Sequence, residues 1–307
     1  MSHPKQLTYD EQLDRIEALG IIVDRSNREK DLSSIENIGY YKLKEFATPF
    51  NSNMTSDGEN IKFKGLSFSN LIKRYYQDKN LRMNILHAIE SIEVSLQIQI
   101  GYILGEKYGP YGYLSFNNWC DRGIEKFDIE EKQYYFKKGL RRKIRKSNMP
   151  DVKYEHNQDK DSFPTIWLAT DALTFGDLVS LIDIMSPNNV RQIAKKYDCN
   201  AQELKSWLGC LNLVRNVCCH NSDLLDIKFK TKPIVPEFYR DDVLSYKDGF
   251  SNGIAIAIFI IVKLMKRINP SYNFKDIRNS FYKVTQDKDD LAESLGFSSV
   301  KAIKYIR

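Results

Sequence analysis

Apolar side chains recur at helical spacing along most of the chain, whereas the alternating pattern of a strand is scarce. In the clearest case, seven apolar residues follow one another at intervals of three or four positions, which places them on one face of an α-helix. They are Leu81, Ile85, Ile89, Ile92, Leu96, Ile100 and Ile103. This spacing predicts a long helix over residues 68–104, with at most one break near Asp78 and an end at Gly105 and Gly109-Pro110. The pattern as a whole predicts an all-α protein.

Capping signals predict where other helices begin. Thr8 and Glu11 have the spacing of a capping box, in which two side chains bond free backbone N–H groups of the first turn, and Asn200 with Glu203 repeats it. The remaining helical periodicity lies over residues 32–38, 40–46, 165–173, 178–185, 190–197 and 252–268. The polar stretch 51–60, with a turn signal at Asp57-Gly58, predicts a surface loop.

These elements divide the chain into three regions. We expect an N-terminal helical region over residues 1–66, a helical core over 67–227, and a C-terminal helical extension over 228–307 that packs on the core. Within the core, residues 111–163 have the least regular pattern, first aromatic, then basic, then polar. We interpret this segment as an insertion between core helices.

The composition narrows the class of protein. With 42% hydrophobic and 28% charged residues among 307, the chain belongs with ordinary folded proteins rather than disordered ones. The longest apolar run, Ile254 to Val262, is far shorter than the roughly 20 residues that a spanning helix needs, so it predicts a buried core helix and no membrane contact. Five cysteines form no disulfide framework and the N-terminus shows no signal-peptide pattern, so a reducing cytoplasm is the expected location.

The net charge of +6 is concentrated in one place. Residues 132–146 contain eight basic and no acidic side chains, and the rest of the chain has 38 basic and 40 acidic residues. General electrostatic wrapping of nucleic acid is therefore excluded, and a local basic patch is indicated. Aromatic residues within this stretch can stack on bases while the cations bind the phosphates, so we predict an RNA-binding surface rather than a merely solvated helix face. Its residues are Lys132, Tyr134, Tyr135, Lys137, Lys138, Arg141, Arg142, Lys143, Arg145 and Lys146.

The sharpest chemical signal is the run Arg215-Asn216-Val217-Cys218-Cys219-His220 at the end of the helix that Asn200 begins. Asn212, Asn216 and His220 are spaced four residues apart and share one polar face. An arginine supplies fixed bidentate donors to a phosphate, and a histidine, whose ordinary pKa is near neutral, can exchange a proton. The alternative to a functional role is that His220 is a helix-terminal histidine that only interacts with the helix dipole.

Here the chain resembles a known group of proteins. Arg215-Asn216 followed by His220 matches the R-x4-6-H motif of HEPN-type ribonucleases. Other stretches over roughly residues 5–227 resemble the abortive-infection (Abi) branch of that superfamily, the AbiD/AbiF-like phage-defence proteins. These stretches are residues 7–12, 38–43 with 49–50, 81–82 with 88–93, 104–110, 164–167 and 173–178.

The resemblance implies a HEPN-type helical bundle and metal-independent cleavage of RNA, with no cofactor. Arg215 would bind the scissile phosphate, His220 would act as acid or base, and Asn216 would orient it. Because one chain offers one such histidine, and HEPN enzymes commonly join two motifs, a homodimer is implied. The chain departs from the family pattern after the motif, where Asn221 and Asp223 replace a histidine and a basic residue.

Other chemistries fit the sequence less well. Cys210, Cys218, Cys219 and His220 have the wrong spacing for zinc, because adjacent residues on a helix diverge by about 100°. A Cys219–His220 nucleophile pair fails on the same geometry. Glu90 and Glu93 lie near the apolar stripe of the long helix, and salt bridges or a solvated edge explain them better than catalysis.

Two functions therefore stand side by side. The first is an RNA endonuclease and toxin of antiviral defence that acts through Arg215, Asn216 and His220. The second is a non-catalytic RNA-binding protein that partners a specific structured, non-coding RNA through residues 132–146. A third hypothesis for the function is a toxin that acts on a protein rather than on RNA.

Overall fold

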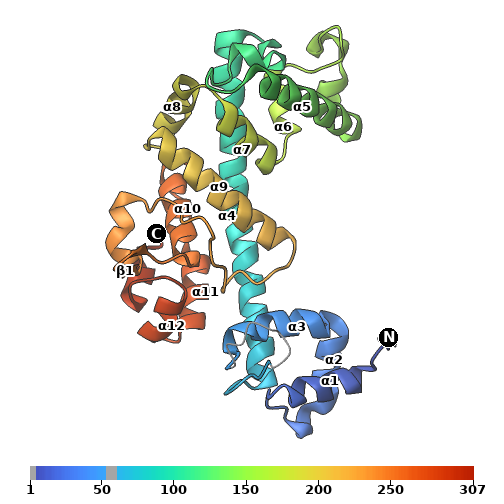
Figure 1. Ribbon diagram of the computed structural model, residues 1–307, viewed down its shortest axis with the longest axis vertical. Coiled ribbons are helices and arrows are strands. Elements are labelled where there is room, and N and C mark those ends of the chain that lie inside the picture. The colour runs from blue at the N-terminus through green and yellow to red at the C-terminus, as the bar shows by residue number, and fades with distance from the viewer. Residues whose placement is uncertain (1–4, 53–60) are drawn as a thin grey trace.

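The computed structural model describes residues 5–52 and 61–307. Its axis is one long helix, α4 (Phe68–Tyr108), which runs through most of the height of Figure 1. The 41 residues span about 60 Å at 1.5 Å per residue. The Ser67 hydroxyl caps the first turn by accepting the N–H of Asn70 at 3.2 Å. The helix continues through Asp78 without a break, and the predicted apolar stripe is buried.

The N-terminal helices pack around the first turns of α4 at the lower end of Figure 1. They are α1 (Tyr9–Ala18), α2 (Arg28–Ile38) and α3 (Tyr40–Ala47). The capping box at Thr8 and Glu11 is confirmed, with both hydrogen bonds present. These helices share a small hydrophobic core with Phe68, Leu71 and Tyr75 of α4, separate from the main core. Of the predicted loop 51–60, residues 53–60 lie outside the described residues.

Residues 111–163, whose sequence pattern is the least regular in the core, contain a long helix at their centre. There the chain forms α5 (Lys126–Lys146), a helix of 21 residues. Its buried positions are Ile129, Leu140 and Ile144, and charged or polar side chains occupy most of the others, which hides the helical pattern. Short 3₁₀ turns precede and follow it.

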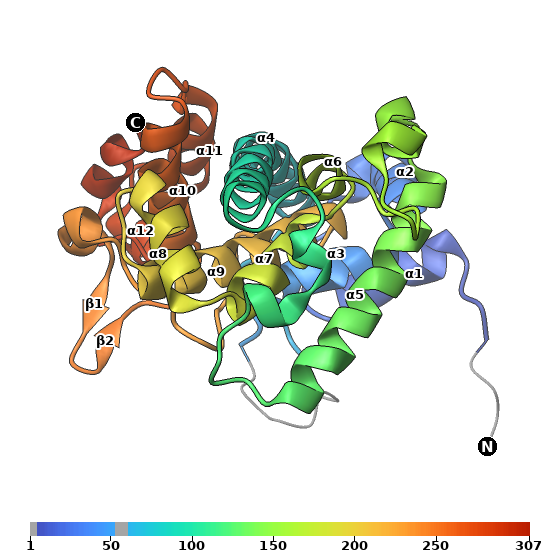
Figure 2. The same cartoon turned by 90° about the horizontal axis from the view of Figure 1, so that it is seen from above.

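The remaining core helices cross or flank the upper half of α4 (Figures 1 and 2). They are α6 (Ile166–Asp171), α7 (Phe175–Ile184), α8 (Pro187–Lys196) and α9 (Ala201–Cys219), close to their predicted positions. Helix α6 lies close to α4 because Gly101 leaves room for it: a Cβ on Gly101 would lie 3.4 Å from the Cα of Trp167.

The C-terminal helices complete the main core beside α4 and α9. They are α10 (Ile254–Ile268), α11 (Lys275–Thr285) and α12 (Asp289–Ser294), preceded by a two-stranded antiparallel hairpin of β1 (Ser245–Tyr246) and β2 (Gly249–Phe250). Helix α10 is buried on nearly all sides, as the apolar run predicts. Within the described part of the chain, no helix combines the length and apolar character that a membrane crossing requires. The all-α fold is confirmed.

Candidate functional site

Helix α9 carries the arginine–histidine motif at its C-terminal end. Asn200 begins the helix with the predicted capping box, and the apolar residues of α9 face the main core. Arg215 is half-buried, whereas Asn216 and His220 are exposed. His220 is the C-cap residue that follows the helix, and its N–H donates to the carbonyl of Asn216 at 2.9 Å. The motif is therefore open to a ligand on one side and anchored in the fold on the other.

The charge of Arg215 interacts with a carboxyl group on α4, that of Glu93. Burial raises the pKa of Glu93, and the charge of Arg215 and a hydrogen bond from the backbone N–H of Phe175 act in the opposite direction. Among the described residues, Arg215 forms no direct ion pair. Its guanidinium donors thus stay available to an anion, although Glu93 lies close by. Sequence reasoning set Glu93 aside, because nothing in the sequence shows that α4 and α9 cross at this residue.

The N-terminus of α7 supports the polar face of α9. The capping box of α7 consists of Thr174 and Asp177, with both hydrogen bonds present. Gly176 lies in the first turn, and a Cβ there would be 3.4 Å from the amide oxygen of Asn212. The backbone N–H of Phe175, in the same turn, bonds the carboxylate of Glu93 on α4. This turn therefore contacts both α4 and α9.

The chain turns sharply after the motif. Asn221 has φ +57°, a left-handed conformation that ends the helix and that asparagine tolerates better than most residues. The N–H of Ser222 then donates back to the carbonyl of Val217 at 3.1 Å. Asn221 therefore has a backbone function in this chain.

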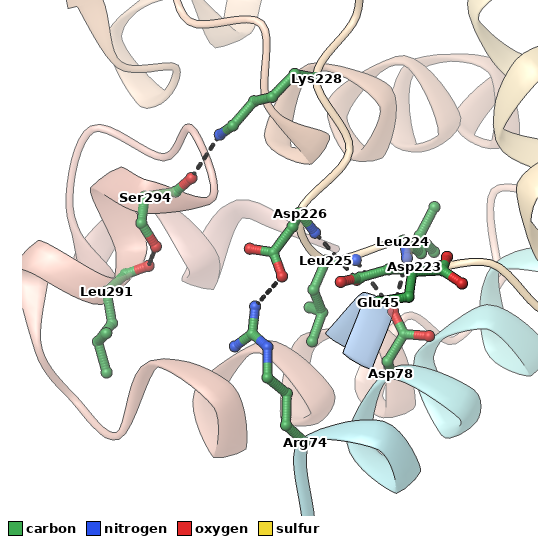
Figure 3. Close-up of polar contacts among 10 residues, drawn as sticks. All are labelled: Glu45, Arg74, Asp78, Asp223, Leu224, Leu225, Asp226, Lys228, Leu291 and Ser294. Carbon is green, nitrogen blue, oxygen red and sulfur yellow. Dashed lines mark hydrogen bonds and ion pairs between the residues drawn. The ribbon is translucent and has the colours of Figure 1, made fainter. Parts of the chain in front are cut away.

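Asp223 lies in a cluster of carboxylates and is half-buried (Figure 3). Its side chain accepts the N–H of Asp226 at 3.3 Å, and its own N–H donates to Glu45 of α3 at 3.0 Å. Burial and the negative charges of Asp226 and Asp78 raise the pKa of Asp223 to about 8, against the opposing charge of Arg74. Asp226 in turn pairs with Arg74 of α4. Asp223 is thus engaged by its own loop.

Asp78 of α4 holds the same loop through hydrogen bonds to its backbone. It is fully buried, and its Oδ1 accepts the N–H groups of Leu224 and Leu225 at 2.9 and 3.0 Å. Its Oδ2 pairs with Nε of Arg82, one turn further along α4, at 2.6 Å. Burial raises the pKa of Asp78 despite these partners. The residue at the expected helix break is instead the anchor of the chain that follows His220.

The predicted RNA-binding residues lie on α5, and most of them are exposed. Tyr134 and Tyr135 are 61% and 59% exposed and border a depression of about 900 Å³. Five of the predicted basic residues line it too, namely Lys137, Lys138, Arg141, Arg142 and Arg145. The guanidinium of Arg141 stacks over the ring of Phe163 at 4.9 Å. Lys132 and Lys146 are exposed outside this depression.

Lys143 differs from the other predicted residues because it points into the fold and pairs with Asp177. Although burial acts to raise the pKa of Asp177, the hydrogen bonds from Lys143 and Thr174 lower it overall. Lys143 therefore attaches α5 to the first turn of α7, the turn that also contacts the polar face of α9. The basic helix and the motif helix are joined through that turn.

Cysteine and metal chemistry finds no centre in the described residues. Across residues 5–52 and 61–307, no three side chains of metal-binding type come together. Cys210 and Cys218 are buried, and Cys219 is exposed. Burial raises the pKa of Cys218 to about 12, which keeps its thiol protonated.

The fold and site define an all-α protein that presents an arginine–histidine motif at a helix end, next to a separate basic helix. A model of the Abi-like protein family matches residues 33–226, well over half of the chain. The chain therefore belongs to this abortive-infection family, and its role lies in phage defence. Among curated proteins and among solved structures, nothing matches the chain.

Proposed function

We propose that this protein is a metal-independent HEPN-type RNA endonuclease that acts as a homodimer in the cytoplasm. The observation that carries the proposal is the arrangement at the end of α9. A half-buried Arg215 without an ion pair among the described residues is followed by exposed Asn216 and His220, and the acidic Asp223 is engaged by its own loop. A cationic donor and a titratable ring at one open helix end suit a phosphodiester.

The proposed reaction needs two proton transfers. An imidazole removes the proton of the ribose 2′-hydroxyl, and the 2′-oxygen attacks phosphorus. The bond to the 5′-oxygen breaks, and that oxygen takes up a proton, which leaves a 2′,3′-cyclic phosphate and a 5′-hydroxyl. Arg215 binds the non-bridging oxygens, where negative charge develops, and Asn216 orients the ring. Because the motif supplies one histidine, His220, the second proton carrier comes from a second copy of the chain.

The test is cleavage of RNA by the purified protein in excess EDTA, with analysis of the product ends. We expect Arg215→Ala and His220→Ala to abolish cleavage and to leave the unfolding midpoint nearly unchanged. His156→Ala, which removes an exposed histidine far from the motif in sequence, is the matched control and should cut normally. Cleavage that persists in both motif variants would refute the assignment, and sedimentation of a strictly monomeric active protein would refute the dimer.

A second function is favoured by the depression on α5, where cations and two exposed tyrosines gather. In this alternative the protein holds a specific structured, non-coding RNA and does not cut it. Reversal of charge at Arg141, Arg142 and Arg145 should then abolish RNA binding. Unchanged affinity would show that α5 does not bind the RNA. A defined RNA species that copurifies with uncleaving protein would favour this function over the nuclease.

A further inference from the structure

A second cationic surface lies along α9 and does not involve α5. The segment after the motif loop alternates lysines with other residues, and Lys228, Lys230 and Lys232 are all exposed. Phe229 between the first two is buried, and its N–H donates to the carbonyl of Asn252 at 2.9 Å. Alternate side chains of an extended segment point to the same side, so the buried phenylalanine directs its lysine neighbours outward.

This segment and α9 enclose a groove of about 740 Å³, which we call the α9 groove. Its floor comes from the outward side of α9, with Gly209, Leu213 and Val217, and Leu213 is 45% exposed. Lysines 205, 228, 230 and 232 line it, and no carboxylate is found among the described residues of its lining. The α9 groove is therefore an apolar channel with a positively charged rim.

Among residues 5–52 and 61–307, none of the four rim lysines forms a direct ion pair. The ammonium of Lys205 donates to the backbone carbonyl of Asp183 at 2.8 Å, and that of Lys228 to the carbonyl of Ser294 at 2.9 Å (the latter in Figure 3). Both acceptors are uncharged. The carboxyl group of Asp183 lies close enough to Lys205 for the lysine charge to oppose the effect of burial, which raises the pKa of Asp183.

The lining of the α9 groove includes Val217, which lies between Asn216 and His220 in the sequence. Asn216 follows Leu213 by three positions, and His220 follows Val217 by three, so each pair lies on one side of the helix. The exposed polar residues of the motif therefore continue the face of α9 that forms the floor of the groove.

We infer that the α9 groove binds the phosphate backbone of a single RNA strand and leads it to Asn216 and His220. A row of cations without carboxylates is complementary to a polyanion, and an apolar floor suits the faces of unpaired bases, which a duplex hides. The identity of the ligand as substrate rests on the proposed function. This track is distinct from the depression on α5, so a long RNA can contact both.

The test removes the two rim lysines that have no hydrogen-bond partner among the described residues, as Lys230→Ala/Lys232→Ala. The control, Lys30→Ala/Lys64→Ala, removes the same charge from exposed positions in the N-terminal region. Binding is measured against salt with a 2′-O-methyl RNA strand, which cannot be cleaved because its nucleophile is blocked. Loss of two phosphate contacts lowers the salt slope by about 1.4, which corresponds to about 25-fold weaker binding at about 0.1 M salt.

Equal affinity and slope in the groove variant and the control would overturn the inference. So would binding of an acidic peptide, but not RNA, to the wild type through the same two lysines. Cleavage of ordinary RNA separates this inference from the proposed function. If the inference and the proposed function both hold, the groove variant raises KM with little change in kcat. If the wild type cuts RNA and the variant keeps its KM, the inference about the groove is refuted and the nuclease function is retained. If the wild type never cuts RNA but the variant loses binding, the groove is supported and the nuclease function is refuted.

Discussion

Asp223→Asn tests the electrostatics of the loop behind the motif. The replacement keeps the shape of the side chain: its carbonyl can accept the N–H of Asp226 as the carboxyl oxygen does, and its amide can donate to the Asp226 carboxylate. The variant thus resembles the protonated acid and cannot ionise. Because the pKa of Asp223 in the fold is raised to about 8, chiefly by burial, the wild type and the variant should differ in how stability depends on pH.

The size of the effect follows from one proton. An aspartic acid in the unfolded chain titrates near pH 3.9, so above that pH the unfolded state has released a proton that the folded state retains up to about pH 8. The contribution of Asp223 to stability is therefore complete below about pH 4 and is lost as the pH rises toward 8. In the middle of this window, the free energy of unfolding should fall by about 1.4 kcal/mol per pH unit in the wild type relative to the variant. Asp78, whose pKa is also raised, is present in both proteins, so its contribution largely cancels.

Urea unfolding followed by circular dichroism at pH 5, 6 and 7 measures this difference. From pH 5 to pH 7 the variant should gain about 2.7 kcal/mol on the wild type, since two pH units separate the ends of the series. Asp248→Asn, at an exposed position in the β1–β2 turn, is the matched control and should run parallel to the wild type. Parallel profiles for Asp223→Asn would refute the raised pKa and the burial from which it is argued.

Two further substitutions and one labelling experiment test other parts of the structure. Asp78→Ala leaves Arg82 without its buried partner and should lower the free energy of unfolding by about 3–5 kcal/mol, measured by denaturant titration; a loss below about 1 kcal/mol would contradict the anchor. Gly139→Ala adds a methyl group in open space within α5 and should raise stability by about 0.5–1 kcal/mol, whereas a loss would contradict the helix. Cys219, the one cysteine that is exposed among the described residues, should be alkylated first in the native protein, and under the proposed function added RNA should protect it, as mass spectrometry of the peptides would show.

Local features of this fold could be predicted because they depend on nearby residues. The apolar stripe of α4 and the capping boxes at Thr8 and Asn200 need only short-range spacing, and the structure confirms them. Helix α5 was hidden because few of its positions are apolar, with Leu140 and Ile144 among them, so its hydrophobic pattern is weak. The excess of basic residues identified this stretch as a charged patch but gave no information about its backbone conformation.

Features that depend on crossing helices could not be predicted. Asp78 is a polar residue in an apolar pattern, and only the fold shows that two amides of a loop more than 140 residues away lie above it. The net balance of charge also concealed Lys228, Lys230 and Lys232, because acidic residues elsewhere cancel them in the sum. Their alternation in the sequence is a signal that could have been read, but their neighbour Lys205 is supplied by α9 from a distant position.

The first turn of α7 explains how the basic helix and the motif keep a fixed relation. Within three consecutive residues, Phe175 bonds the α4 carboxylate beside Arg215, Gly176 lies against the polar face of α9, and Asp177 pairs with Lys143 of α5. The capping box satisfies two of the free N–H groups of this first turn. Helices α4, α5 and α9 are therefore all contacted by one capped turn. Under the proposed function, RNA bound on α5 would keep a fixed position relative to Arg215, so that both sites would act on one molecule although α5 and α9 are separate helices.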